Sequence, residues 1–159
     1  MAEHFSDITV LKPRRKYKIG LFSVMPIPAF HNVECYSFII EHESFGRLAF
    51  ITDSFQWPYN VKDINTLMIE ANFDEQLRAN AILSGFEPKS RSVYHMSLNK
   101  CISVINRLKS PSLQPVLLLH LSPRLSDSEA FKQAIREQCG IRAEVASENT
   151  EFILRKDDF

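Results

Sequence analysis

The sequence predicts an α/β (α+β) fold, in which a mixed β-sheet is flanked by helices. Two observations predict it. The first half of the 159 residues contains short runs of aromatic and β-branched residues separated by turn formers, and the second half alternates strand-like apolar runs with helical periodicity. The first pattern is typical of antiparallel hairpins and the second of βα units, so one sheet is expected to contain both kinds of pairing.

The elements of the first half are expected in hairpin order. Strands are expected at 8–11 and 17–25, with Gly20 as a turn or bulge between apolar stretches. Pro26 and Pro28 are expected to end the ladder, because proline has no N–H to donate. The HESFG turn should join strands 34–41 and 47–52 into a hairpin, and 66–69 should be a short buried strand.

Three helices are expected in the second half. The first covers 74–83, with Asn72 or Asp74 as its N-cap and Gly85 as its stop. The second covers 97–109, and its apolar residues recur at the 3.6-residue spacing of one helix face. The third covers 126–138, where Ser126 and Glu129 have the spacing of a capping box. Short strands at 141–146 and 151–154 complete the expected order.

Composition bounds the class of protein. Hydrophobic residues make up 45% of the chain, which is enough for the core of one domain over residues 1–159, with 1–7 expected to be disordered. Nineteen basic residues balance nineteen acidic ones, so no net charge attracts nucleic acid or an anionic membrane. No segment is long and apolar enough to span a membrane, and the N-terminus lacks a signal-peptide pattern. The protein is expected to be cytoplasmic, with Cys35, Cys101 and Cys139 as reduced thiols.

Polar groups follow three apolar runs closely. Asp53 follows LAFIT, Glu70 follows TLMI, and His120 follows VLLL. The carboxyl ends of neighbouring strands meet in one crevice, where α/β sheets place their ligands. Taken singly, each group also has an ordinary structural role, since an acidic side chain often caps a turn and a histidine often binds a loop carbonyl.

Five fragments in order carry a family resemblance. They are FHNVECYSFIIEH, FITDSF, MIEANFD, HMSLNKC and LLLHLS. No single one is specific, but their order and spacing resemble the C-terminal half of metallo-β-lactamase-fold hydrolases, in particular the phosphodiesterase and ribonuclease Z-like branch. The resemblance covers roughly residues 8–154 and implies one half of an αββα sandwich.

The resemblance implies roles for five residues. Asp53 resembles the carboxylate that bridges two metal ions, and His95 and His120 resemble imidazole ligands of one ion each. His31 and Asn32 resemble a pair close to the substrate, where His31 would orient a phosphate or protonate a leaving oxygen. The implied cofactors are two divalent ions, zinc or manganese, in the complete protein. Glu70 is interpreted as structural or as a support for the ligands.

The chain departs from the family in the loop after His120, where Pro123, Arg124 and Leu125 stand at positions that are usually small and polar, and more strongly at one motif. The HxHxDH loop that supplies most metal ligands is absent, because no two histidines are separated by one residue. Each ion would keep one histidine and the shared Asp53, fewer than the three protein ligands usual for a catalytic zinc. We therefore expect a fragment or incomplete form that is inactive alone and binds metal weakly or not at all. Its open sheet face is expected to pack against a missing N-terminal half or a second copy in a homodimer.

Three functional hypotheses remain at this point. The first is a metal-dependent hydrolase acting on phosphodiesters. The second is a non-catalytic binding or assembly module that keeps the fold without a working metal site. The third is an unrelated α/β domain whose polar strand ends are coincidental, and it requires that Asp53, His95 and His120 do not converge.

Overall fold

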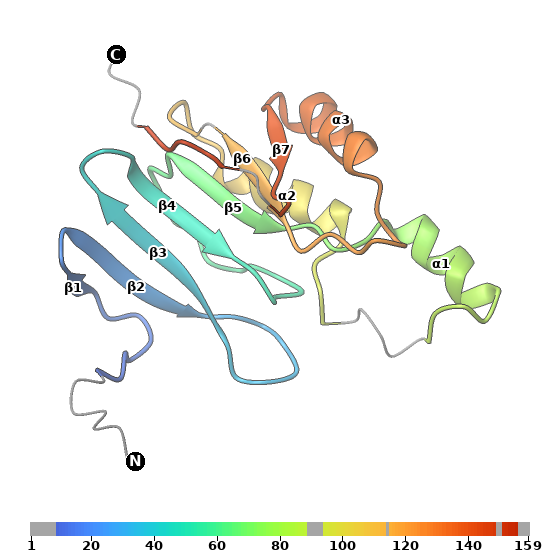
Figure 1. Cartoon of the computed structure of the whole chain (residues 1–159), viewed down its shortest axis with the longest axis horizontal. Helices are drawn as coiled ribbons and strands as arrows, with labels where there is room; N and C mark the ends of the chain where they lie inside the picture. The colour runs from blue at the N-terminus through green and yellow to red at the C-terminus, as the bar shows by residue number, and fades with distance from the viewer. Residues whose placement is uncertain (1–8, 89–93, 114, 149–150, 156–159) are drawn as a thin grey trace.

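The computed structural model describes residues 9–88, 94–113, 115–148 and 151–155. Within these ranges seven strands form one sheet in the order β1-β2-β3-β4-β5-β6-β7. The elements in chain order are β1 (Tyr17–Ile19), β2 (Phe22–Pro28), β3 (Tyr36–His42), β4 (Gly46–Ile51), β5 (Thr66–Glu70), α1 (Glu75–Leu83), α2 (Leu98–Leu108), β6 (Val116–Leu119), α3 (Ser128–Cys139) and β7 (Ala143–Val145) (Figure 1). No helix in the described ranges has the length and apolar character that crossing a membrane requires.

The sheet is mixed, as the sequence predicts. Strands β1 to β4 pair antiparallel, and β4 to β7 pair parallel. The hairpin around HESFG forms as predicted, with His42 opposite Gly46. Because β4, β5 and β6 are parallel neighbours, their carboxyl ends lie at the same edge of the sheet.

The helices are anchored by local capping. Asp74 caps α1 by accepting hydrogen bonds from the backbone N–H groups of Gln76 and Leu77, and Ser97 caps α2. The capping box predicted for α3 is wrong. Asp127 is the N-cap, and the hydroxyl of Ser126 instead donates to the carbonyl of Ser122. The Asp127 carboxylate accepts from the backbone N–H groups of Glu129 and Ala130, and Gly140 ends α3 in the left-handed conformation.

The predicted end of the ladder at Pro26 and Pro28 is also wrong. Strand β2 continues through Pro26 and Pro28, because both residues direct their backbone away from β3. The Pro26 carbonyl accepts from the Arg14 N–H, and the Pro28 carbonyl accepts from the Tyr59 hydroxyl. The missing proline N–H groups therefore leave no gap in the β2–β3 ladder.

Two further expected strands do not form in the described ranges. Residues 9–11 of the first are irregular, and Val10 is 80% exposed; residue 8 lies outside the described residues, as does the predicted disorder of residues 1–7. Residues 151–154 are also irregular. Neither segment has a hydrogen-bonded strand beside it, and an apolar sequence alone does not make a strand.

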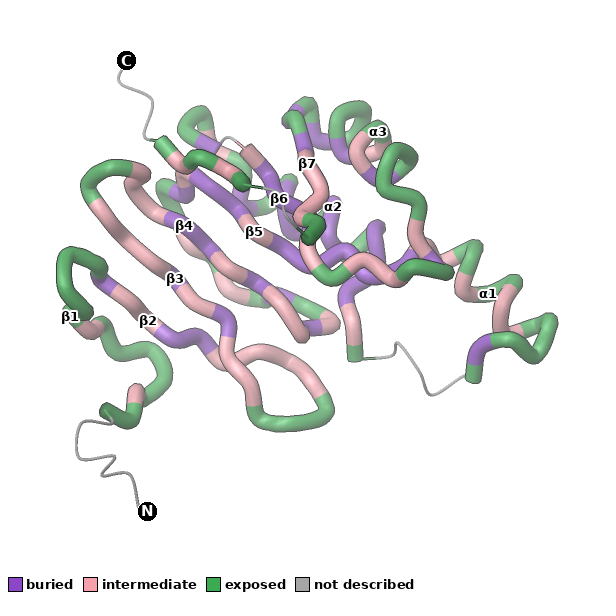
Figure 2. Tube along the Cα trace, in the orientation of Figure 1, coloured by how far each residue is buried: buried purple, intermediate pink, exposed green. Residues whose placement is uncertain are grey.

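The core lies on one face of the sheet. The buried row of α2 packs in one cluster with Ile51, Ile69 and Leu118 from the central strands. Figure 2 shows this burial concentrated on β4, β5 and β6. On the opposite face, cross-strand partners place Phe38 beside Phe50 and Phe50 beside Met68, and all three are only half-buried. The sheet therefore has one covered face and one partly open apolar face.

Candidate metal centre

The candidate site lies at the carboxyl ends of three parallel strands. Asp53 follows β4, Glu70 ends β5, and His120 follows β6. Asp53 and His120 both adopt left-handed backbone, with φ of 48° and 58°. Residues other than glycine reach this conformation at a cost, and such strain persists mainly where the surroundings impose it. The turn at each strand end thus aims a polar side chain back across the edge of the sheet.

His120 lies between two carboxylates. Its Nδ1 atom is 3.3 Å from Oδ1 of Asp53 and 3.3 Å from Oε1 of Glu70. The side chains of Asp53 and His120 are 41% and 44% exposed, whereas that of Glu70 is fully buried. The Asn72 side-chain N–H donates to the His120 carbonyl at 2.7 Å, which fixes the turn after β6.

His95 enters the site from the loop before α2. The backbone N–H of Asn72 donates to the Met96 carbonyl, and the Leu98 N–H donates to the Phe73 carbonyl, so this loop is tied to the end of β5. The His95 Nδ1 atom lies 2.6 Å from Oε1 of Glu70 and 4.0 Å from Oδ1 of Asp53. The His95 and His120 rings meet edge to face at 4.9 Å.

His31 completes the cluster from the loop between β2 and β3. This loop is held against the loop after β4, because the Phe30 N–H donates to the Ser54 hydroxyl and the Phe55 N–H donates to the Phe30 carbonyl. The His31 ring lies 5.0 Å from the His95 ring. Its Nδ1 is 3.0 Å from the Tyr94 carbonyl, which can only accept, so Nδ1 carries the proton and Nε2 is left for a ligand.

Electrostatics in the site are set mainly by burial. Burial, the dominant cause, raises the pKa of Glu70 to about 7, although the Ser54 N–H donates to this carboxylate and opposes the rise. Burial also lowers the pKa of His95, and the neighbouring His31 acts in the same direction. Both shifts favour the uncharged forms of two groups that are in direct contact.

The predicted site residues converge. Donor atoms of His31, Asp53 and His95 lie within 4.8 Å of one another, as do those of Glu70, His95 and His120. The third hypothesis requires that Asp53, His95 and His120 do not converge, and this condition is not met. Asn32 is exposed next to His31.

Sequence reasoning underestimated one residue. Glu70 was interpreted as a support, yet it contacts both His95 and His120 and belongs to one of the two donor groups. Its position could have identified it. Glu70 ends β5, and β5 lies between β4, which leads to Asp53, and β6, which leads to His120. Of the cysteines, all three are free thiols; Cys101 and Cys139 are buried, and Cys35 is half-buried with its thiol 3.4 Å from the Asp53 carbonyl.

Comparisons with known proteins place the fold. No family model matches the sequence, and no curated protein matches it. Among solved structures, the metallo-β-lactamase-fold protein YhfI from Bacillus subtilis superposes with a TM-score of 0.66 at 16% identity, over 87% of this chain and 52% of that protein. The metallo hydrolase Igni18 from Ignicoccus hospitalis matches with 0.59 at 12% identity, over 86% and 56%.

A third match differs in chemistry. CmlA from Streptomyces venezuelae, a diiron β-hydroxylase, matches with a TM-score of 0.53 at 13% identity, over 89% of this chain and 34% of CmlA. The chain thus has the fold of part of a metallo-β-lactamase domain, and it spans about half the length of YhfI and Igni18. The predicted fold class is confirmed.

Proposed function

We propose that this chain carries the strand-end part of a metal-dependent hydrolase site directed at phosphodiesters. The observation that carries the proposal is the convergence of Asp53, Glu70 and His120 at adjacent parallel strand ends, with His120 Nδ1 3.3 Å from an oxygen of each carboxylate. Two matched structures with the same fold are named for a metallo-β-lactamase fold and a metallo hydrolase, which supports metal chemistry at this edge.

The spacing of the donor atoms fits a divalent ion. Two ligand atoms at zinc distances of about 2.1 Å in tetrahedral geometry are separated by about 3.4 Å. The 3.3 Å separations around His120 agree with this value and exceed a normal hydrogen bond. Imidazole nitrogen and carboxylate oxygen suit zinc and manganese. The residues that would hold an ion are His31, Asp53 and His95 in one donor group and Glu70, His95 and His120 in the other. Asp53, whose Oδ1 atom also lies 3.3 Å from Nδ1 of His120, would be the shared carboxylate of the complete site.

When bound, such ions would supply a hydroxide at neutral pH and would polarise the phosphoryl oxygens of a diester. The chain's own residues do the rest. Asp53 holds its carboxylate at the centre of the cluster, and the Glu70 carboxyl fixes the His95 ring through Nδ1. His31, with Nδ1 bound to the Tyr94 carbonyl, presents Nε2 to orient a phosphate or to protonate a leaving oxygen, and Asn32 contacts the substrate at the rim.

The site is proposed to be one part of a larger one. His31, His95, His120 and the two carboxylates form two donor groups that both contain His95. These residues therefore cannot supply complete ligand sets for two separate ions. A second half with its own sheet, packed on the partly open face around Phe38, Phe50 and Met68, would supply the remaining ligands. The chain alone is therefore proposed to bind metal weakly and to lack activity.

Metal titration tests the proposal. Chelator-treated protein is titrated with Zn²⁺ and Mn²⁺ by calorimetry, and D53N and H120Q are compared with H42Q, which changes a histidine outside both donor groups. We expect D53N and H120Q each to weaken binding by at least about tenfold and H42Q to leave it unchanged. Equal affinity in all four proteins would overturn the metal site and leave a non-catalytic assembly module.

Phosphodiester recognition has its own readout. Mn²⁺ is paramagnetic, so a phosphorus nucleus held near it relaxes faster. The Mn²⁺-loaded protein should broaden the ³¹P line of dimethyl phosphate, and N32A, which changes a residue outside both donor groups, should reduce the broadening while Mn²⁺ affinity is retained. Broadening no greater than that by free Mn²⁺ would remove the phosphodiester assignment and leave the metal site standing.

A further inference from the structure

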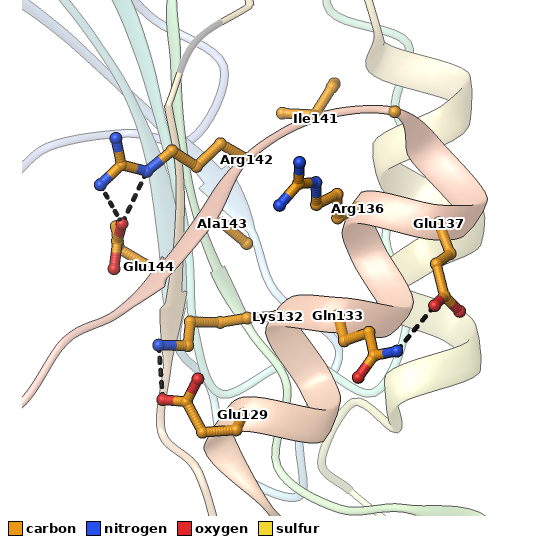
Figure 3. Close-up of a pocket in the computed structure, with 10 residues that line it drawn as sticks. Glu129, Lys132, Gln133, Arg136, Glu137, Ile141, Arg142, Ala143 and Glu144 are labelled. Atoms are coloured by element: carbon orange, nitrogen blue, oxygen red, sulfur yellow. Dashed lines mark hydrogen bonds and ion pairs between the residues drawn. The ribbon is translucent and has the colours of Figure 1, made fainter.

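The outer edge of the sheet lies beside an open groove. Strand β7 and the flank of α3 line this groove, which has a volume of about 1150 Å³. Figure 3 shows side chains of both elements extending into it. In the described ranges no strand pairs with the outer edge of β7.

Backbone groups on this edge are free to accept a strand. The Arg142 carbonyl accepts from Val116 and the Ala146 N–H donates to Leu118, so these two residues face β6. Alternate residues of a strand direct their backbone groups to opposite sides, so the N–H and C=O of Ala143 and Val145 point outward. The described residues 151–155 lie over β6 and β5 and do not cover this edge (Figure 1).

The charges beside these groups are self-complementary. Arg142 and Glu144 flank Ala143 on one face of the strand and form an ion pair at 2.6 Å. If two copies of β7 pair antiparallel with Ala143 opposite Ala143, Arg142 of each copy stands opposite Glu144 of the other. Opposite charges directly across an antiparallel pair stabilise it.

Charges on α3 are also complementary about a two-fold axis that passes through Ala143. Ala143 lies three residues beyond Gly140, a rise of about 10 Å along a strand. The same rise takes about seven residues back along α3, to the level of Lys132 and Gln133, and Figure 3 shows Ala143 between Arg136 and Lys132 along the groove. A two-fold axis at this level also places Arg136 opposite Glu129 of the second copy.

We propose that this chain forms a two-fold symmetric homodimer in which the β7 edges pair antiparallel around Ala143 and the α3 helices lie side by side. The two sheets then continue into one another, and the free edge of β7 is no longer exposed to non-specific strand pairing. This interface is separate from the open sheet face and from the metal centre, and it does not depend on the proposed hydrolase function.

Charge reversal tests the dimer. Sedimentation equilibrium should show a monomer–dimer equilibrium for the unchanged protein. E144R places four cations around the axis and should weaken dimerisation by at least about tenfold, while the double variant R142E/E144R restores the complementary pairs and the affinity. E148R, which reverses an exposed charge beyond β7, is the matched control and should leave dimerisation unchanged.

Amide exchange gives a second readout that needs no substitution. Protection of the Ala143 and Val145 N–H groups should increase with protein concentration, while that of Glu144, which faces β6, should not change. A monomer at all concentrations would overturn the proposal, as would equal dimerisation of E144R and the unchanged protein.

Discussion

The Nδ1 atom of His95 lies 2.6 Å from Oε1 of Glu70, a carboxylate that is fully buried beneath the exposed strand-end site. Asp53 and His120 stand above this pair at the surface, and their side chains are about two-fifths exposed. The contact fixes the His95 ring and leaves its Nε2 atom for a ligand or substrate. The buried Glu70 carboxyl thus lies beneath the exposed donor groups and contacts both histidines.

Glu70 should make the stability of the metal-free protein depend on pH. Its pKa is raised from 4.5 to about 7 in the fold, mainly by burial. The folded state therefore binds the proton more tightly than the unfolded state, and this contribution is fully present below pH 4.5 and is lost as pH rises through about 7. Relative to E70Q, the unfolding free energy should fall by about 3 kcal/mol across this window.

Urea denaturation of chelator-treated protein at a series of pH values measures this effect. Comparison with E70Q removes the opposite contribution of His95, whose lowered pKa reduces stability as pH falls through its usual titration range. Parallel pH profiles for the two proteins would show that Glu70 keeps its charge in the fold.

His120 should prefer glycine to alanine as a replacement. Both substitutions remove the imidazole, but only glycine adopts a φ of 58° without a steric penalty. H120G is expected to be more stable than H120A by about 1 kcal/mol in the metal-free protein. Thermal denaturation of both variants measures the difference.

The matched control for backbone strain is His95, whose φ is not positive. There the order should reverse, with H95A more stable than H95G, because glycine gains more conformational entropy on unfolding. If alanine were the more stable replacement at position 120 as well as at position 95, the strand-end turn at His120 would carry no strain.

The N-cap of α3 separates the sequence prediction from the structure. Asp127 accepts hydrogen bonds from the N–H groups of Glu129 and Ala130, both at 3.0 Å. D127A should therefore lower the unfolding free energy by about 1 kcal/mol. E129A tests the capping box that the sequence predicts. It should lower the unfolding free energy by well under half as much, because the Ser126–Glu129 box does not form. Chemical denaturation of both variants decides between the two caps.

The open sheet face should bind a hydrophobic dye. Phe38, Phe50 and Met68 form a half-buried row on the side of the sheet away from α2, and unpartnered apolar patches of this kind mark interaction surfaces. The double variant F38K/F50K should reduce the fluorescence of an anilinonaphthalene dye several-fold, whereas L83K, at an exposed residue of α1, should change it little. If the unchanged protein binds no dye, this face has no exposed apolar patch for a second half to cover.

Much of the fold follows from the sequence by itself, because local physics determines it. Asp74 and Ser97 cap helices through hydrogen bonds within their own turn, and Gly46 lies at the tight end of the β3–β4 hairpin where its Cβ position is filled by Asn65. The alternation of strands and helices likewise predicted βα units in the second half of the chain, whereas the parallel pair of β4 and β5 has no helix between its strands and became visible only in the structure.

Only the tertiary structure decided what depends on neighbours distant in sequence. Pro26 and Pro28 stay in the ladder because Arg14 and Tyr59 bind their outward carbonyls. Glu70 becomes a central group of the site because two histidines from separate loops close over it and exclude water. A side chain's pKa and its partners are properties of its surroundings, and those surroundings exist only once the chain has folded.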